Sequence, residues 1–66
     1  MQLTVNGTLE TTCTGATVTD LISEHNLHPL HVAVELNQKL ISRKLFDSTS
    51  LSEGDTVEIV TFVGGG

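Results

Sequence analysis

The sequence predicts a single α+β domain, in which one helix covers one face of a mixed sheet of four or five strands. Several short segments alternate polar and apolar residues, as half-buried strands do. One segment, which begins at Thr17, has the periodicity of a helix. The run 56–63 is rich in β-branched residues, and a last strand parallel to the first would place both in the middle of the sheet. At 66 residues the chain can bury one small core.

A β-hairpin is the first predicted element. Residues 2–5 alternate polar and apolar side chains, which predicts a strand. Asn6-Gly7 is a strong signal for a two-residue hairpin turn, because both turn positions need a positive φ. Residues 8–13 are then the returning strand, and we expect Cys13 to be half-buried in it.

The helix is predicted from its cap and its period. The Thr17 hydroxyl can accept from a first-turn N–H while Asp20 reaches back, which is a capping pattern. The helix must end by His28, because Pro29 disfavours helical geometry in the residue before it. The face expected to point to the core carries Val18, Leu21, Ile22 and His25.

A second hairpin follows the helix. Residues 31–36 alternate, with Val32, Val34 and Leu36 on one face. Asn37-Gln38 predicts a tight turn. Residues 39–41 are predicted to form a short strand. We expect this strand at an edge of the sheet, because a lysine such as Lys39 on an edge strand discourages pairing with another chain.

The segment 42–50 is irregular, and we expect one helical turn that carries Leu45 and Phe46 inward. Residues 52–55 form a turn before the last strand, 56–63. That strand has apolar residues on both faces, and the helix can cover only one of them.

Val60 and Phe62 lie on the face of the last strand that the helix cannot cover. If they are exposed, they form an apolar patch of the kind that docks a partner. The alternative is that a loop residue such as Phe46 covers them.

The charge of the chain limits its partners. Eight acidic and three basic residues give a net charge of −5. This charge argues against nucleic acid as a partner and favours a protein partner with a basic surface. The alternative is that the acidic residues serve solubility alone. The single cysteine, the lack of a signal segment and the lack of about 20 consecutive apolar residues predict a cytoplasmic protein with no membrane contact.

Other candidate sites are weak. Three histidines, His25, His28 and His31, have regular spacing, but Pro29 breaks the helix that would align them, so we expect no metal. Two interpretations of Arg43 are open. It forms, with Lys44, a pair of surface bases that balances the acids, or it contacts an acidic patch on a partner. We expect no enzyme activity from a chain this small, and no bound cofactor.

The sequence ends in Gly64, Gly65 and Gly66, directly after the last strand. Three residues without side chains extend at most about 10 Å, and they could carry a carboxylate into a narrow cleft. The alternative is a frayed terminus. We expect a domain at 1–63 and a flexible glycine tail at 64–66.

These features together resemble a known family. The resemblance is carried by eight segments: Val5-Asn6-Gly7, Thr17-Val18, Leu21-Ile22, 32–37, Ser42-Arg43, 51–55, 57–60 and 62–66. They are similar to the ThiS family, the sulfur carriers of thiamine biosynthesis within the ThiS/MoaD superfamily, which has the ubiquitin-like β-grasp fold. The chain departs from the family at Ser42, where a proline is common, and near Phe46, where a tryptophan is common.

The resemblance implies a carrier function. A ThiF-like enzyme would use ATP to adenylate the carboxylate of Gly66, and a persulfide, supplied indirectly by a cysteine desulfurase, would convert it to a thiocarboxylate. The carrier would then give its sulfur to the thiazole synthase ThiG. Gly64 and Gly65 would be the stalk, with Val60, Phe62 and Arg43 as docking residues.

Three alternatives remain open from the sequence. A MoaD-like small subunit of molybdopterin synthase would use the same tail, although such subunits are usually longer and carry an alanine where this chain has Gly64. A ubiquitin-like protein modifier would form an isopeptide bond, but no processing extension follows the glycines here. A plain interaction module would have an inert tail.

Overall fold

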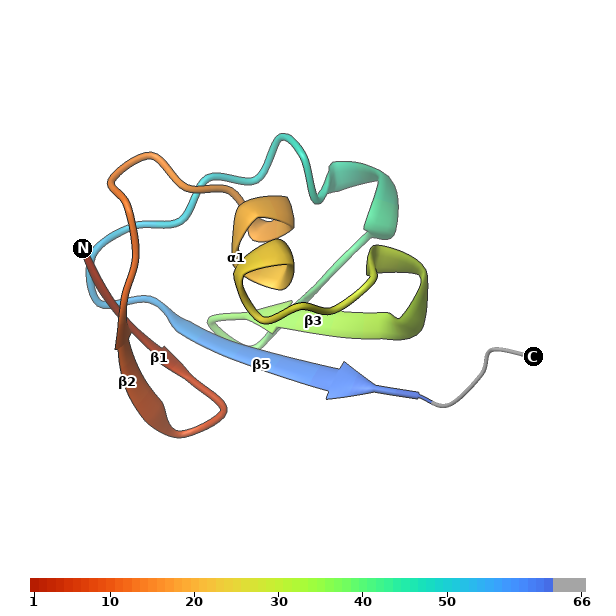
Figure 1. Ribbon diagram of the computed structural model, residues 1–66, viewed down its shortest axis with the longest axis horizontal. Coiled ribbons are helices and arrows are strands. Elements are labelled where there is room, and N and C mark those ends of the chain that lie inside the picture. Colours follow the sequence, from red (N-terminus) through yellow and green to blue (C-terminus); the bar gives the residue numbers. More distant parts are fainter. Residues whose placement is uncertain (63–66) are drawn as a thin grey trace.

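The computed structural model describes residues 1–62. The end of the predicted domain at residue 63 and the predicted flexible tail at 64–66 lie outside the described residues. The elements are β1 (Gln2–Val5), β2 (Thr8–Thr11), α1 (Val18–Glu24), β3 (Val32–Leu36), β4 (Lys39–Ile41) and β5 (Thr56–Thr61), with 3-10 turns η1 (Pro29–His31) and η2 (Arg43–Leu45). This content confirms the predicted α+β class (Figure 1).

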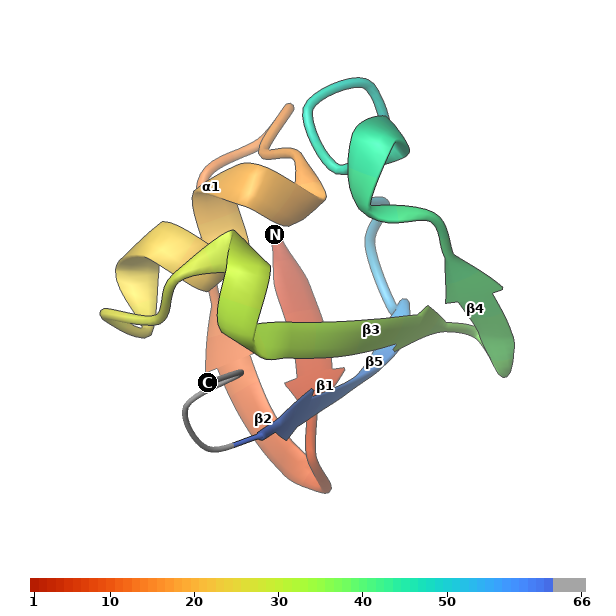
Figure 2. The same ribbon diagram turned by 90° about the vertical axis from the view of Figure 1, so that its right-hand side faces the viewer.

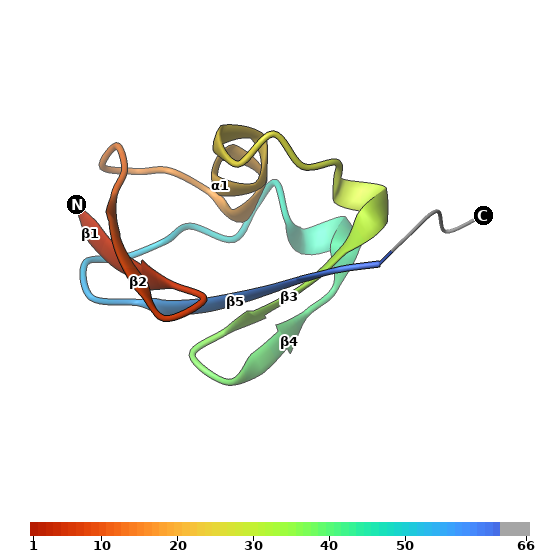
Figure 3. The ribbon, with the colours of Figure 1, turned by 60° about the horizontal axis from the view of Figure 1, so that its bottom comes forward.

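The five strands form one mixed sheet in the order β2-β1-β5-β3-β4. β5 lies in the centre, parallel to β1 and antiparallel to β3 (Figure 3). The prediction that the first and last strands lie side by side inside the sheet is therefore confirmed. β4, which begins with Lys39, is an edge strand as predicted.

Both hairpins turn through left-handed backbone. Asn6 and Gly7 have φ values of 49° and 82°, and Asn37 and Gln38 have φ values of 50° and 70°. Two successive residues with positive φ fit the twist of the flanking strands, so these turns set the register on both sides of the sheet.

The returning strand of the first hairpin is shorter than predicted. β2 ends at Thr11, and the N–H of Thr12 donates to the Met1 carbonyl at 2.9 Å. The register of β1 and β2 brings Thr12 opposite Met1, where their pairing ends, and the chain leaves the sheet after Thr12. The prediction for Cys13 was wrong, because this residue lies exposed in the loop beyond the strand.

The helix begins with the predicted capping box. The Thr17 hydroxyl accepts from the Asp20 N–H at 3.3 Å, and the Asp20 carboxylate accepts from the Thr17 N–H at 2.9 Å. The helix packs on one face of the sheet (Figure 2). Its fully buried residues are Val18, Leu21 and Ile22.

The core is completed by the segment between β4 and β5. Phe46 is buried there as predicted, with 3% of its surface exposed, but Leu45 is 48% exposed. The prediction for Leu45 was wrong. In a 3-10 turn successive side chains point about 120° apart, so two neighbours cannot both face the core.

No helix among residues 1–62 is long and apolar enough to cross a membrane.

Candidate functional site

The face of the sheet opposite α1 is open around β5. Val57 and Ile59 are buried beneath the helix, so strand alternation turns Val60 and Phe62 the other way. Val60 is 60% exposed and Phe62 is 40% exposed. Phe46 is buried in the core on the helix side, so the alternative that it covers this patch is excluded.

The neighbouring strands extend this patch. Ala33 lies directly opposite Val60 across β3 and β5, and Leu40 lies opposite Glu35 across β3 and β4. Leu40 is 72% exposed. Six residues on this side of β3, β4 and β5, or directly after β5, are called here the open sheet face: Ala33, Glu35, Leu40, Glu58, Val60 and Phe62.

Arg43 lies beside the open sheet face and is exposed. It lines a hollow of about 210 Å³ together with Ala33, Leu40 and four neighbours. Its Nε donates to the Pro29 carbonyl at 2.9 Å, and Nη2 lies 3.5 Å from the Val32 carbonyl. Arg43 therefore links η2 to η1 and does not pair with an acid within residues 1–62.

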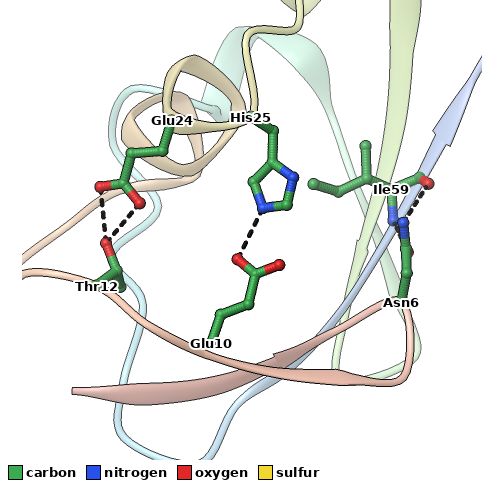
Figure 4. A network of polar contacts seen from close by, with 6 residues as sticks. All are labelled: Asn6, Glu10, Thr12, Glu24, His25 and Ile59. Carbon is green, nitrogen blue, oxygen red and sulfur yellow. Dashed lines mark hydrogen bonds and ion pairs between the residues drawn. The ribbon is translucent and has the colours of Figure 1, made fainter.

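The side chain of Asn6 holds β5 in place (Figure 4). The ladder between β1 and β5 includes two residue pairs, Thr4–Thr56 and Val5–Val57. Beyond it, Asn6 Oδ1 accepts from the Ile59 N–H at 2.7 Å and Asn6 Nδ2 donates to the Ile59 carbonyl at 3.2 Å. The amide thus imitates one further residue of strand pairing.

A second asparagine holds the start of β5. The Asn37 N–H donates to the Thr56 carbonyl at 2.8 Å, and Asn37 Oδ1 accepts from the Thr56 N–H at 2.9 Å. The sequence predicts only a turn at each of Asn6 and Asn37. Their residue type was the only available signal, because nothing in the sequence shows which strand lies beside each turn.

Two polar contacts tie the helix to the first hairpin (Figure 4). His25 Nε2 lies 2.8 Å from Glu10 Oε1, and the Thr12 hydroxyl donates to the Glu24 carboxylate at 2.8 and 2.9 Å. These contacts hold the helix over the buried face, which leaves the opposite face open.

The three regularly spaced histidines do not converge. His25 is turned to Glu10, whereas His28 Nδ1 accepts from the Leu30 N–H at 3.1 Å. The rings of His28 and His31 lie 5.1 Å apart. In the described part of the chain, no three His, Cys, Asp or Glu side chains are grouped to hold a metal ion.

A larger hollow of about 440 Å³ lies beside the helix, away from the open sheet face. It is lined by Cys13, Asp20 and Glu24 among others. The carboxylates of Asp20 and Glu24 are already bonded to Thr17 and Thr12. The predicted tail residues Gly64, Gly65 and Gly66 lie outside the described residues.

Comparison with known proteins places this fold and this tail in one family. The model of the ThiS family matches residues 2–66. The sulfur carrier protein ThiS of Bacillus subtilis (strain 168) is 38% identical over 50 residues, which are 76% of this chain and 76% of that protein. A crystal structure of the thiamine biosynthesis protein ThiS from Geobacter metallireducens superimposes with a TM-score of 0.84 at 40% identity, covering all of both chains.

A thiazole synthase of Paramagnetospirillum magneticum is 33% identical over all 66 residues of this chain. The chain spans 20% of the length of that relative. The Geobacter structure confirms the predicted β-grasp arrangement of the sheet and helix. From the match of the family model across nearly every residue, together with these relatives, the chain belongs to the ThiS family.

Proposed function

We propose that this chain is a sulfur carrier of thiamine biosynthesis, and that the carboxylate of Gly66 is its reacting group. The observation that carries the proposal is the extent of the family match, which continues through the glycines to residue 66. The chain acts as a sulfur-donating cosubstrate and not as an enzyme. The relative from Bacillus subtilis, a sulfur carrier protein by name, supports this assignment.

The chemistry starts from an ionised carboxylate, which is a poor electrophile at neutral pH. A ThiF-like enzyme would activate it: a carboxylate oxygen attacks the α-phosphorus of ATP, and pyrophosphate leaves. A persulfide sulfur then attacks the carbonyl carbon and AMP leaves. The product is an acyl disulfide that keeps the S–S bond of the persulfide. A thiol must finally attack that S–S bond, which forms a disulfide with the donor sulfur and releases the thiocarboxylate. The persulfide comes ultimately from a cysteine desulfurase.

The carrier itself supplies a slim tail and a docking face. ATP and its metal would be held by the activating enzyme, so the carrier needs no cofactor of its own. From Phe62 to Gly66 the chain can reach at most about 14 Å. An enzyme that holds Gly66 in its active site must therefore approach the end of β5.

The open sheet face lies at that end, which supports Val60 and Phe62 as docking residues. Arg43 stands at its margin beside the 210 Å³ hollow. Because its guanidinium is bonded to the backbone, we propose that Arg43 shapes this margin and offers its remaining donors to a partner.

We propose a thiazole synthase, ThiG, as the acceptor of the sulfur, and the cytoplasm as the place of the reaction. The likeness of this chain to a segment of two proteins named thiazole synthase supports the pairing. A molybdopterin synthase partner or a lysine on a target protein would need the same activated tail, and no observation on the described residues favours either.

The test is adenylation of a variant with a blocked tail. Gly65→Val adds a branched side chain next to the reacting carbonyl and leaves the domain untouched. We expect it to unfold at the wild-type temperature and to lose ATP–pyrophosphate exchange with the ThiF-like enzyme. Exchange at the wild-type rate would contradict the proposal, whereas Gly64→Ala, one position further from the carbonyl, serves as the milder control.

A further inference from the structure

The carboxylates of this chain fall into two groups. Six of the eight acids accept a hydrogen bond or bridge a histidine; they are Glu10, Asp20, Glu24, Asp47, Glu53 and Asp55. The carboxylates of Glu35 and Glu58 have no hydrogen bond and no ion pair to any other of the residues 1–62, and both residues are exposed. The placement of these two unpartnered carboxylates has no explanation in a contact among residues 1–62.

These two glutamates lie directly opposite each other in the β3–β5 ladder. Directly opposed residues have Cβ atoms roughly 4.5–5.5 Å apart, and like charges in such a pair destabilise the sheet. The bases do not relieve this repulsion. Lys39 lies opposite Leu36, which places it toward the other face, and Arg43 is bonded to the Pro29 carbonyl. Lys44, on η2, forms no ion pair with an acid among residues 1–62.

Protection of a sheet edge does not explain the pair. Charged residues often blunt edge strands, but β3 and β5 are both interior strands of this sheet. Solubility does not require two like charges to be placed opposite each other in the middle of a sheet. An unrelieved repulsion at this position is therefore better explained by a cation that arrives with a partner.

The side chains around the two glutamates indicate the chemistry of the partner surface. Leu40 lies directly opposite Glu35 on one side, and Val60 lies two residues beyond Glu58 on β5. Both apolar side chains are more than half exposed. The open sheet face therefore presents two carboxylates between apolar residues. It is complementary to a basic side chain with apolar neighbours.

We infer that Glu35 and Glu58 together receive an arginine or lysine of the adenylating enzyme, while apolar residues around that cation pack on Leu40 and Val60. The inference rests on the proposed function, in which this face docks the enzyme. A guanidinium offers five donors in a planar fork and can bridge two carboxylates. An enzyme that binds the phosphates of ATP carries cations near its active site, so it attracts a chain with a net charge of −5.

The test compares two double variants with the same change in charge. Glu35→Gln/Glu58→Gln removes the opposed pair. Asp47→Asn/Glu53→Gln removes two charges outside the sheet, and its amide oxygens can still accept from the Thr19 hydroxyl and the Gln2 N–H. Each variant and the wild type are titrated with the ThiF-like enzyme at several salt concentrations, and thermal unfolding is followed in parallel.

We expect Glu35→Gln/Glu58→Gln to unfold at the wild-type temperature or above, because a repulsion is removed. Its Kd should rise about tenfold or more, and the salt dependence of Kd should become shallower. The control should bind within about twofold of wild type. This combination, a carrier that is no less stable and binds less well, is the signature of a pair kept for docking.

An equal loss of affinity in both double variants would overturn the inference, because only net charge would then matter. Unchanged binding of Glu35→Gln/Glu58→Gln to the ThiF-like enzyme would also overturn it. In each of these cases the proposed function still stands if the wild-type chain is adenylated. A wild-type chain that is not adenylated would instead contradict the proposed function.

Discussion

At the scale of single residues, Asn6 performs two tasks that are usually separate. Its backbone takes a φ of 49° in the first hairpin turn, a region that asparagine tolerates better than most residues. Its side chain pairs with both backbone groups of Ile59, on a strand 53 positions away. Asn6 therefore fixes the turn and also the position of the strand that leads to the tail.

Substitutions at Asn6 separate these two tasks. Asn6→Gly keeps the positive φ and loses both bonds to Ile59, so the free energy of unfolding should fall by about 1–2 kcal/mol. Asn6→Ala also has to adopt the left-handed backbone, which costs about a further 1 kcal/mol. Urea unfolding of the two variants measures both differences. If Asn6→Gly is as stable as wild type, the pairing with Ile59 contributes nothing.

At the scale of elements, the helix depends on its surroundings. α1 has seven residues, and a helix that short is not stable alone in water. It is held by the capping box of Thr17 and Asp20, by three buried apolar residues and by the contacts of His25 and Glu24 with the first hairpin. The cap is the part that can be removed without opening a cavity.

Thr17→Ala removes the hydroxyl that accepts from the first turn of α1. We expect the free energy of unfolding to fall by about 1 kcal/mol. Thr17→Ser keeps the acceptor and should lose less than half of that amount. Chemical denaturation of the pair measures the cap, and equal losses in both variants would show that the methyl group of Thr17, and not its hydroxyl, matters.

The sequence predicts structure correctly where the signal is local. The Asn6-Gly7 turn, the Thr17 cap and the alternation in β3 each depend on residues only a few positions apart, and all were predicted. The predictions for Cys13 and Leu45 were wrong, because their exposure depends on where strand pairing ends and on the tight pitch of η2.

The sequence does not decide whether Val60 is exposed, for a related reason. The sequence shows that β5 is apolar on both faces, but not where distant segments such as the one around Phe46 pack. The tie between Asn6 and Ile59, and the opposition of Glu35 to Glu58, depend on sheet order and register, which no local pattern in the sequence specifies.

At the scale of the whole molecule, one central strand connects the parts. β5 contributes Val57 and Ile59 to the core on one side and Val60 to the open sheet face on the other. The glycines follow β5 in the sequence. A carrier built in this way presents its open sheet face at a fixed place relative to the end of β5, which is what an enzyme that docks there, as proposed, would need to position the carboxylate of Gly66.

Docking through this face predicts an asymmetry between two exposed apolar residues. Phe62→Ala should raise the Kd for the ThiF-like enzyme by about tenfold or more, because truncation of an aromatic anchor often removes much of the binding free energy. Leu45→Ala truncates another exposed apolar side chain, one that is not part of the open sheet face, and should bind within about twofold of wild type. Calorimetric titration measures both, and equal effects would contradict docking at this face.

The most direct test of the carrier function is the intact mass of the chain after incubation with a ThiF-like enzyme, ATP and a cysteine desulfurase with cysteine. In a sulfur carrier we expect the replacement of one oxygen by one sulfur at Gly66 and no such change in Gly65→Val. The added sulfur should be lost when a thiazole synthase and its other substrates are supplied. An unchanged mass in the presence of an active enzyme, or sulfur that the synthase leaves in place, would contradict this function.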